Sequence, residues 1–390
     1  MDLKAAARDV IFRAEPQLID LSHRIHANPE LGYEERKASR WLCDLLSAEG
    51  FDVATGICEL ETAFAARAGS GPLHIAICAE YDCLPGIGHA CGHNVIAGSA
   101  VGAGMAAKLL ADELGITVTV LGTPAEEVGD GSGKILMLER GGFDGQHAAM
   151  MVHPAPADII EASMLALASL EVHYHGKAAH ASAFPEFGIN AADAMVIAQT
   201  AIGLMRQQMR AVDRVHGIIT RGGEAPNVIP AHTSAAYFVR SRTIGDLEEI
   251  KQKVLKCFEA GALATGARLE VIGGTRPAAE VIHDHELAAV FRRNAESLGR
   301  NFISWPNTER GTGSTDMGNV SQVIPSIHPL LGINSLPALN HQPEFAAHCA
   351  TPIADKTLLD GALAMAWTII DAAQDSKLRG RLTSRVYHSH

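Results

Sequence analysis

The chain has 390 residues, enough for two domains, and 47% of them are hydrophobic, which indicates a folded protein with a large core. The formal net charge of −12 disfavours nucleic acid and anionic membranes as main partners. No apolar run approaches the roughly 20 residues that cross a bilayer, and the first residues lack the apolar core of a signal peptide. Because the seven cysteines are scattered, we expect free thiols and a cytoplasmic location.

Predicted helices and strands alternate over the first 165 residues. The hydrophobic patterns predict helices over residues 5–25, 38–49, 95–114 and 134–140, and strands over 62–67, 73–79, 116–121 and 148–152. This alternation predicts an α/β domain with a mostly parallel sheet and helices on both faces.

The pattern changes between residues 165 and 272. Strands are predicted over 165–175, 215–220, 234–240 and 267–272, with helices over 190–210 and 244–265. This order of elements is typical of the ferredoxin-like α+β unit. We therefore expect an inserted dimerisation or lid domain over residues 166–276, with free strand edges that favour a homodimer and hinge motion at the two chain crossings.

The α/β pattern resumes after residue 277, so residues 1–165 and 277–390 are predicted to form one catalytic domain. A helix is predicted over 284–298, followed by the loop sequence Gly-Thr-Gly-Ser-Thr-Asp-Met-Gly-Asn-Val at 311–320, an apolar stretch over 324–333 and a final helix over 352–373. The tail from Asp375 is basic and polar, and we expect it to be frayed.

Potential metal ligands follow three of the predicted strands. Cys91 and His93 come after strand 73–79, Glu126 and Glu127 after strand 116–121, and His153 directly after strand 148–152. Pockets form at the carboxyl ends of parallel strands, so these side chains are expected to meet. Zinc accepts thiolate, imidazole and carboxylate ligands together, while one of two adjacent carboxylates can remain free to move a proton.

Each of these features also has a structural explanation. A Cys-x-His sequence occurs by chance, adjacent glutamates usually form a solvated surface pair, and a histidine before proline is often part of a turn. The case for a metal site rests on their joint placement after successive strands. A thiol between histidines could instead be redox-active, which is a separate hypothesis for Cys91.

Six motifs along the chain carry a family resemblance. They are His26-Ala-Asn-Pro-Glu-Leu-Gly-Tyr-Glu-Glu, His89-Ala-Cys-Gly-His-Asn, Pro124-Ala-Glu-Glu, Gly176-Lys-Ala-Ala-His-Ala-Ser, Asn227-Val-Ile-Pro and His341-Gln-Pro-Glu-Phe. The chain resembles the M20 metallopeptidases, in particular the M20D amidohydrolase branch. Its Asn94 variant of the second motif is most similar to aminobenzoyl-glutamate hydrolases and the M20-domain-protein-2 dipeptidases.

The resemblance implies a centre of two divalent metal ions, with zinc favoured and manganese or cobalt as alternatives. The implied metal ligands are Cys91, His93, Glu127, His153 and His341. Glu126 would be the general base, and His180 would reach the active site of the partner subunit and steady the oxyanion. Asn227 and Arg240 would hold the scissile carbonyl and the carboxylate of the substrate.

Several neighbouring residues leave alternatives open. His348 competes with His341 as the last ligand, although the sequence around His341 fits the motif better. His89, Asp82 and His328 are expected to support the ligands, while Asp82 could also bridge two metals. Asn94 replaces the commoner aspartate and cannot act as an anion behind a ligand histidine.

The predicted function is metal-dependent hydrolysis of the amide bond of an N-acyl amino acid or a related small amide that bears a carboxylate, including aminobenzoyl-glutamate-like substrates. A dipeptidase of the β-alanyl-lysine type is the first alternative. A non-catalytic binding protein on the same fold is the remote one, because fold alone does not fix function.

Overall fold

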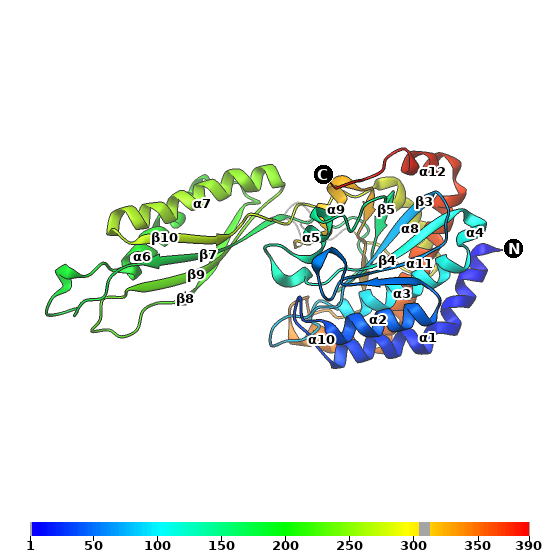
Figure 1. The fold of residues 1–390 in the computed structure, drawn as a ribbon, viewed down its shortest axis with the longest axis horizontal. Coiled ribbons are helices and arrows are strands. Elements are labelled where there is room, and N and C mark those ends of the chain that lie inside the picture. Colours follow the sequence, from blue (N-terminus) through cyan, green and yellow to red (C-terminus); the bar gives the residue numbers. More distant parts are fainter. Residues whose placement is uncertain (1, 304–312, 390) are drawn as a thin grey trace.

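The computed structural model describes residues 2–303 and 313–389 of the chain. These residues form two units that lie one after the other along the long axis of the molecule (Figure 1). The larger unit contains a six-stranded and a two-stranded sheet, and the smaller contains a separate four-stranded sheet. The predicted fold class, an α/β domain with a ferredoxin-like insertion, is confirmed. The exact domain boundaries at 165 and 277 stay a prediction.

The six-stranded sheet is mixed but mostly parallel. Its strands, in spatial order, are β1 (Asp52–Thr55), β2 (Phe64–Ala68), β4 (Ile116–Gly122), β3 (Leu73–Ala79), β5 (Ala148–Met150) and β11 (Ser326–Ile327). The last four are parallel to one another, whereas β1 and β2 pair antiparallel at one edge. The short β6 (His153–Ala155) and β12 (Leu330–Gly332) form the two-stranded parallel sheet. Consequently, the carboxyl ends of β3, β4 and β5 lie at the same edge.

Helices cover both faces of this sheet. The helices of this unit are α1 (Leu3–Ala27), α2 (Arg36–Ala48), α3 (His93–Leu109), α4 (Ala111–Leu114), α5 (Gly133–Glu139), α8 (His285–Ser297), α9 (Met317–Val323), α10 (Pro343–His348), α11 (Pro352–Gln374) and α12 (Ser376–Thr383). Ile75 and Ile77 of β3 face the core beneath α1, α3 and α11, while Ala76 and Cys78 face the core with α5 and α9. A strand that is buried on both faces reads as a continuous apolar run, as the sequence of β3 does.

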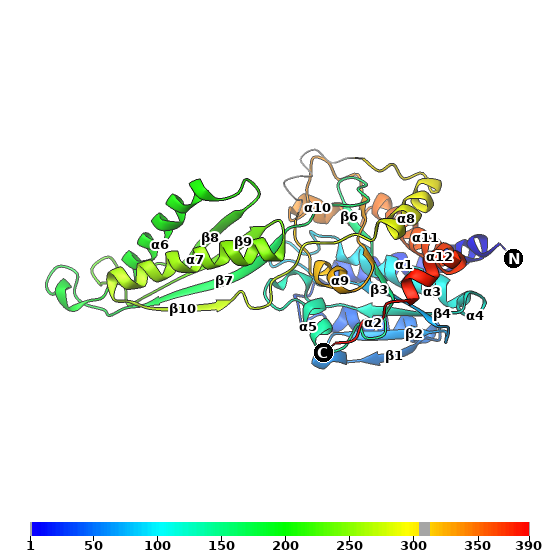
Figure 2. The same cartoon turned by 90° about the horizontal axis from the view of Figure 1, so that it is seen from above.

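The smaller unit has the predicted ferredoxin-like order. Its strands are β7 (Ala166–His175), β8 (Arg214–Arg221), β9 (His232–Ser241) and β10 (Arg268–Gly273), in the spatial order β10-β7-β9-β8, and all neighbours are antiparallel. Helices α6 (Ala191–Met205) and α7 (Ile244–Thr265) pack against each other and against one face of β7 and β9. The two helices lie together on one side of the sheet (Figure 2). Among the described residues, no helix of this unit covers the opposite face.

Three elements differ from the prediction. Strand β1 was not predicted, because its four residues are largely exposed and carry no alternating pattern. The helix expected over 95–114 divides at Leu110 into α3 and α4. The helix expected over 190–210 ends at Met205 and continues only as a short 3-10 turn.

The expectation of a frayed tail from Asp375 is wrong. The side chain of Asp375 caps α12, and Leu378 and Leu382 of that helix are buried. Arg379 donates hydrogen bonds to the carbonyl oxygens of Leu114 and Gly115. Arg381 pairs with Asp284 and Glu286, so two of the basic residues that suggested a solvated tail instead bind groups of the main domain.

Within residues 2–303 and 313–389, no helix combines the length and the apolar character needed to cross a membrane. Gly311 and Thr312, at the start of the loop sequence 311–320, lie outside the described residues.

Candidate metal centre

The loop between β3 and α3 brings Cys91 and His93 to the edge of the sheet. His93 is the first residue of α3, and Gly92 before it has a φ of 79°, which favours glycine. A Cβ atom on Gly92 would lie 2.4 Å from Cγ of Pro154. Glycine at this position therefore allows the loop to approach the chain beside His153.

Glu126 and Glu127 lie on a turn that two buried carboxylates hold. Ala125, just before them, has a φ of 57°, an uncommon value for a residue with a side chain. The backbone N–H of Ala125 donates to Oε1 of Glu35 at 2.8 Å, and the N–H of Glu127 donates to Oδ2 of Asp82 at 3.0 Å. These hydrogen bonds to carboxyl oxygens fix the backbone that carries both glutamates.

His153 and His341 reach the same place from two other segments. His153 begins β6, and its Nδ1 lies 2.8 Å from the carbonyl oxygen of Pro154, so its Nε2 is the free ring nitrogen. The backbone N–H of His341 donates to the carbonyl oxygen of Ala90 at 2.9 Å. This contact ties the C-terminal segment to the loop that carries Cys91.

All five predicted ligands lie in one cluster, and Cys91 is its shared member. Two sets of side chains that include Cys91 have their ligand atoms within 4.8 Å of one another: Cys91 with His93 and His153, and Cys91 with Glu127 and His341. Sγ of Cys91 lies 3.5 Å from Nε2 of His153 and 3.6 Å from Nε2 of His341. His348, the rival of His341, belongs to neither set. Cys91 is thus common to two groups of three, and a third group, His93 with Glu126 and Glu127, places the predicted base beside one ligand of each.

The donor atoms of the cluster are those that a metal would engage. Nε2 of His93 and Oε1 of Glu127 are buried without a hydrogen bond among the described residues. Nδ1 of His93 lies 2.8 Å from Oδ1 of Asp82, an arrangement that fixes the ring and raises the basicity of its other nitrogen. Asp82 uses both of its oxygens in this way, on His93 and on the Glu127 backbone. These contacts favour a supporting role for Asp82 over a bridge between metals.

Burial and neighbouring charges shift the pKa values of several side chains in the cluster. Burial opposes a charge on His93, but Asp82 and Glu80 outweigh it and raise the pKa of that histidine well above its usual value. Burial and the neighbouring Glu127 raise the pKa of Glu126 well above its usual value. Burial also lowers the pKa of His153 to about 4, which keeps its imidazole neutral and able to act as a ligand.

The thiol of Cys91 does not have the properties of a redox nucleophile. Burial, followed by the charge of Glu127, raises the pKa of Cys91 well above its usual value. Reactive cysteines have a lowered pKa, because the thiolate is the reactive species. The raised pKa of the thiol gives no support to the redox hypothesis for Cys91.

A fully buried ion network that the sequence prediction did not include lies behind the cluster. Nζ of Lys134 lies 2.5 Å from Oε1 of Glu80 and 2.7 Å from Oδ1 of Asp316, and all three side chains are completely buried. The second oxygen of Glu80 is 3.4 Å from Nε2 of His93. The sequence showed Lys134 only as part of a short helix; an isolated lysine in its first turn gives no signal of burial.

The first motif of the chain, His26–Glu35, supports the turn that carries the glutamates. The completely buried carboxylate of Glu35 accepts hydrogen bonds from the Ala125 backbone and from Oγ1 of Thr62, the latter at 2.8 Å. The hydroxyl of Tyr33 donates to the carbonyl oxygen of Gly131. The sequence pattern identified this motif but gave it no role. The structure shows that the motif packs against residues 125–131.

Three predicted site residues lie outside the cluster. Nδ1 of His180 accepts hydrogen bonds from the backbone of Ser182 and Ala183, and the backbone of Asn227 bonds to Ala181. Arg240, near the end of β9, donates from Nη1 to Oγ of Ser314 at 2.8 Å. Within the described ranges, no hydrogen bond joins any of the three to the five clustered side chains.

The remaining polar residues that the sequence highlighted are structural. Nδ2 of Asn94 donates to Oγ of Ser22 and to the carbonyl oxygen of Cys349, both at 2.9 Å, so Asn94 joins α3 to α1 and to the segment before α11. His328 is completely buried against His153, with 5.5 Å between ring centroids. Burial lowers the pKa of His328 and of His89 to about 3, which keeps both neutral.

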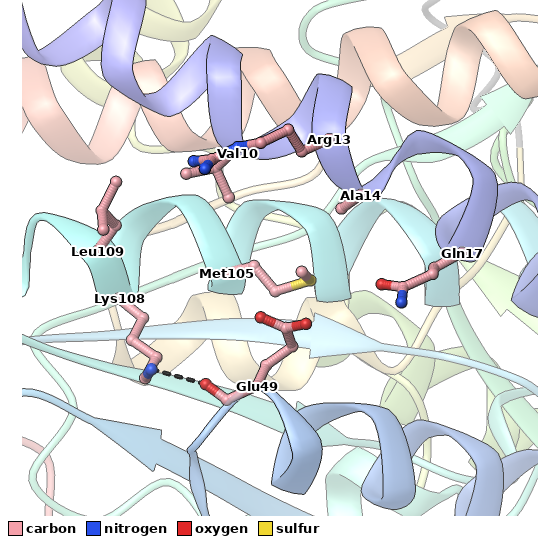
Figure 3. Close-up of a pocket in the computed structure, with 8 residues that line it drawn as sticks. All are labelled: Val10, Arg13, Ala14, Gln17, Glu49, Met105, Lys108 and Leu109. Atoms are coloured by element: carbon pink, nitrogen blue, oxygen red, sulfur yellow. Dashed lines mark hydrogen bonds between the residues drawn. The ribbon is translucent and has the colours of Figure 1, made fainter.

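A surface hollow of about 310 Å³ lies between α1, α3 and the end of α2, away from the cluster (Figure 3). Its lining is a mixture of apolar and charged side chains, among which Nζ of Lys108 donates to the carbonyl oxygen of Glu49 at 2.6 Å. None of the predicted site residues lines it. The hollow is therefore separate from the candidate metal centre.

The comparisons with known proteins identify the family. The family model described as "Peptidase family M20/M25/M40" matches residues 76–362, and the chain belongs to this family. It is a metallopeptidase-type hydrolase that acts on C–N bonds. The predicted family is thereby confirmed.

Two relatives and two solved structures illustrate the similarity. The Xaa-Arg dipeptidase of Mus musculus is 38% identical over 384 residues, covering 95% of this chain and 88% of the relative. One of the subunits of the p-aminobenzoyl-glutamate hydrolase of Escherichia coli (strain K12) is 32% identical over 283 residues, covering 67% of this chain and 58% of the relative. The Bacillus subtilis YXEP protein, described as a dinuclear metal binding peptidase from the M20 family, superimposes with a TM-score of 0.68 at 22% identity, covering 92% and 98%. The aminobenzoyl-glutamate utilization protein from Klebsiella pneumoniae gives a TM-score of 0.70 at 18% identity, covering 91% and 97%.

Proposed function

We propose that this protein is a dinuclear metal-dependent dipeptidase that hydrolyses the amide bond of a small substrate with a free carboxylate. The observation that carries the proposal is the position of Cys91 between two ligand groups, one with His93 and His153 and one with Glu127 and His341. One sulfur atom can bind two metal ions at once if the ions lie close together. The similar solved structure described as a dinuclear metal binding peptidase supports the same number of metal ions, two.

The residues present fit a zinc centre best. The set of one thiol, three imidazoles and one carboxylate matches the ligand preferences of zinc, with manganese and cobalt as alternatives. Bound metal would lower the pKa of a water molecule and polarise the substrate carbonyl. The buried donor atoms of His93 and Glu127 that lack hydrogen bonds are explained if they bind metal.

Glu126 is the proposed general base. Oε2 of Glu126 lies 3.9 Å from Nε2 of His93, and the side chain is 9% exposed. Its backbone neighbour Glu127 is a proposed ligand, so Glu126 remains free to take a proton from the attacking water and to pass it to the leaving nitrogen. A general base that later donates its proton to the leaving nitrogen is helped by a raised pKa. Burial and Glu127 raise the pKa of Glu126 in this way.

Arg240 and Asn227 are the proposed groups that bind the substrate. Burial lowers the pKa of Arg240, and its described side-chain hydrogen bond is to the hydroxyl of Ser314 rather than to a carboxylate. A guanidinium that has no carboxylate partner among the described residues can bind the substrate carboxylate through two hydrogen bonds. Asn227 is proposed to hold the scissile carbonyl.

His180 is proposed to act on a partner subunit. It lies in the inserted unit, and the described hydrogen bonds of its ring are with Ser182 and Ala183. Strand β8 is an edge strand whose residues are mostly exposed, so a second copy could pair with it in a homodimer. Mixing His180→Ala protein with Glu126→Gln protein tests this: restored activity in the mixture supports the role in trans, and its absence contradicts it.

We place dipeptides ahead of N-acyl amino acids, the opposite of the order predicted from sequence, because of the relatives. Xaa-Arg dipeptidases of mouse and human are both 38% identical over nearly the whole chain, which favours dipeptides with a basic C-terminal residue. N-acyl amino acids, including aminobenzoyl-glutamate, are the second candidate, favoured by the 32% identity to the p-aminobenzoyl-glutamate hydrolase subunit. A non-catalytic role has no support, because the base and all five ligand side chains are present.

The deciding experiment is a hydrolysis screen with zinc, manganese and cobalt in turn. The substrates are dipeptides ending in arginine, lysine or glutamate, N-acetyl amino acids and aminobenzoyl-glutamate. Preferential release of a C-terminal basic amino acid supports the dipeptidase. Preference for the acylated substrates supports the second candidate, and no hydrolysis of any of these amides with any metal overturns the proposal.

A further inference from the structure

Three histidines lie together on the helix-free face of the four-stranded sheet. His173 and His175 are two residues apart on β7, so their side chains lie on the same face, and His232 on β9 pairs directly with His175. The alternate residues Val172 and Tyr174 are buried against α6 and α7, which confirms that the histidines face away from the helices. All three histidines are partly exposed.

The three rings are arranged as a compact cluster. Nδ1 of His173 lies 3.0 Å from Nε2 of His232. The rings of His175 and His232 are nearly parallel, with 4.8 Å between their centroids, and those of His173 and His232 lie 5.3 Å apart. Two nitrogens on adjacent strands therefore already face each other, and the third ring lies beside them. The three rings do not each present a nitrogen within 4.8 Å of the others as they stand, so zinc binding would require the His175 side chain to turn.

The surrounding charges are compatible with a bound cation. Glu171 contacts Nε2 of His173 at 3.0 Å, and Glu270 on β10 contacts Nε2 of His175 at 3.1 Å. Arg221 and Arg268 are the neighbouring cations, and each is paired with a carboxylate, Glu224 and Glu270 respectively. Burial, followed by Arg221, His175 and His173, lowers the pKa of His232, so its ring is neutral near pH 7. Neutral imidazole is the form that binds metal.

We propose that His173, His175 and His232 form a surface site for one zinc ion, separate from the hydrolytic centre. Three imidazole ligands from an i, i+2 pair on one strand and a third residue on the adjacent strand suit tetrahedral zinc, with water as the fourth ligand. The site shares no residue with the cluster around Cys91, which belongs to the other unit of the fold. It does not depend on the proposed hydrolytic function.

Zinc in this site would join β7 to β9. A ligand that binds the folded protein and not the unfolded chain stabilises the fold. We therefore expect an increase in the thermal stability of the inserted unit at zinc concentrations that fill the surface site. The stabilisation would be additional to any effect of metal in the hydrolytic centre.

Zinc counting on the full-length protein tests the site. Wild type and the double variant His173→Gln/His232→Gln are equilibrated with the same buffered free zinc, and bound zinc per chain is measured. Wild type is expected to bind one more zinc ion than the double variant, and the contribution of the hydrolytic centre cancels in the difference. His216→Gln is the matched control: His216 lies on the same face of the sheet, packed on Phe238, and its removal should leave the count unchanged.

A zinc-edge anomalous difference map of the wild-type crystal provides a second measurement, which holds even if the double variant does not fold. A peak about 2.0–2.1 Å from nitrogens of His173 and His232 supports the site. The proposed surface site is overturned if wild type and a folded double variant bind the same number of zinc ions. It is also overturned if a zinc-soaked crystal shows no peak beside His173 and His232. Retention of this peak in Cys91→Ser protein would separate the surface site from the hydrolytic centre.

Discussion

Oδ1 of Asp82 lies 2.8 Å from Nδ1 of His93 at the completely buried base of the cluster, and the other oxygen of Asp82 accepts the backbone N–H of Glu127. One carboxylate thus orients a proposed ligand of each metal group. Asn94, the residue after His93, carries no charge, and the anionic partner of His93 is Asp82, eleven positions before it in the chain. The substitution at Asn94 therefore leaves His93 with an anionic partner.

Asp82→Asn should weaken metal binding by about 10- to 100-fold, as expected when the partner of a ligand histidine is neutralised. The dissociation constant for zinc can be measured by competition with a chelator. Asp355→Asn is the matched control, since Asp355 also contacts a histidine ring, that of His23, at 2.8 Å but away from the cluster. Equal zinc affinities of wild type and Asp82→Asn would contradict the role of Asp82.

The periodicity of the sequence was sufficient to predict most of the fold, and the strand ends predicted that Cys91, His93, Glu127 and His153 would meet. His341 was expected only from the family resemblance. Strand β3 and helix α7 have the predicted bounds because a buried strand and a long amphipathic helix carry strong patterns. The four exposed residues of β1 carry no such pattern and were missed. The helical tail was mispredicted because Arg379 and Arg381 bind carbonyl and carboxylate groups that come from distant parts of the chain.

The residues behind the cluster could not be predicted from local pattern. Lys134 contacts carboxylates 54 and 182 positions away, and Glu35 bonds to a backbone 90 positions away. Lysine and glutamate are almost never completely buried unless paired, so composition predicts them at the surface. Such long-range pairs become visible only when the tertiary structure brings the partners together.

Substitution of single ligands should separate the two metal positions. His153→Gln and His341→Gln each remove a member of one group only, so each variant should retain about one metal ion per chain. Cys91→Ser removes the shared member and should weaken both positions. Metal content after dialysis at fixed free zinc measures this. Two tightly bound ions in Cys91→Ser protein would show that Cys91 is not shared.

Glu126→Gln should lower kcat/KM by about 10²- to 10⁴-fold, because the amide cannot accept the proton of the attacking water. Its metal content should remain that of wild type, since Glu126 is not a proposed ligand. Glu139→Gln, a surface glutamate paired with Arg276, is the control and should be fully active. A Glu126→Gln protein with bound metal and a near-wild-type rate would contradict the mechanism.

Lys134→Met should destabilise the fold by about 3–5 kcal/mol, because it leaves the carboxylates of Glu80 and Asp316 buried without their cation. The free energy of unfolding can be measured by urea denaturation. Lys356→Met is the control: Lys356 is 64% exposed and pairs with Asp360, and the loss of such a pair should cost about 1 kcal/mol or less. Similar losses in the two variants would mean that the buried network contributes no more than a surface pair.

Glu35 should make the metal-free protein less stable as the pH rises. Burial, followed by the charge of Asp82, raises the pKa of Glu35 from 4.5 to about 7. A carboxyl group with a raised pKa holds its proton more tightly in the folded state, so its contribution to stability is complete below pH 4.5 and is lost as the pH rises to about 7. The shift corresponds to about 3 kcal/mol.

Glu35→Gln should remove this pH dependence while it keeps the contact to the turn, since a glutamine oxygen can still accept the N–H of Ala125. The variant should therefore gain stability relative to wild type as the pH rises from about 4.5 to about 7, measured by urea unfolding in the presence of a chelator. Glu61→Gln is the control, because Arg36 lowers the pKa of the exposed Glu61 and no such gain is expected. If wild type and Glu35→Gln lose stability in parallel over this range, Glu35 does not hold a proton in the folded state.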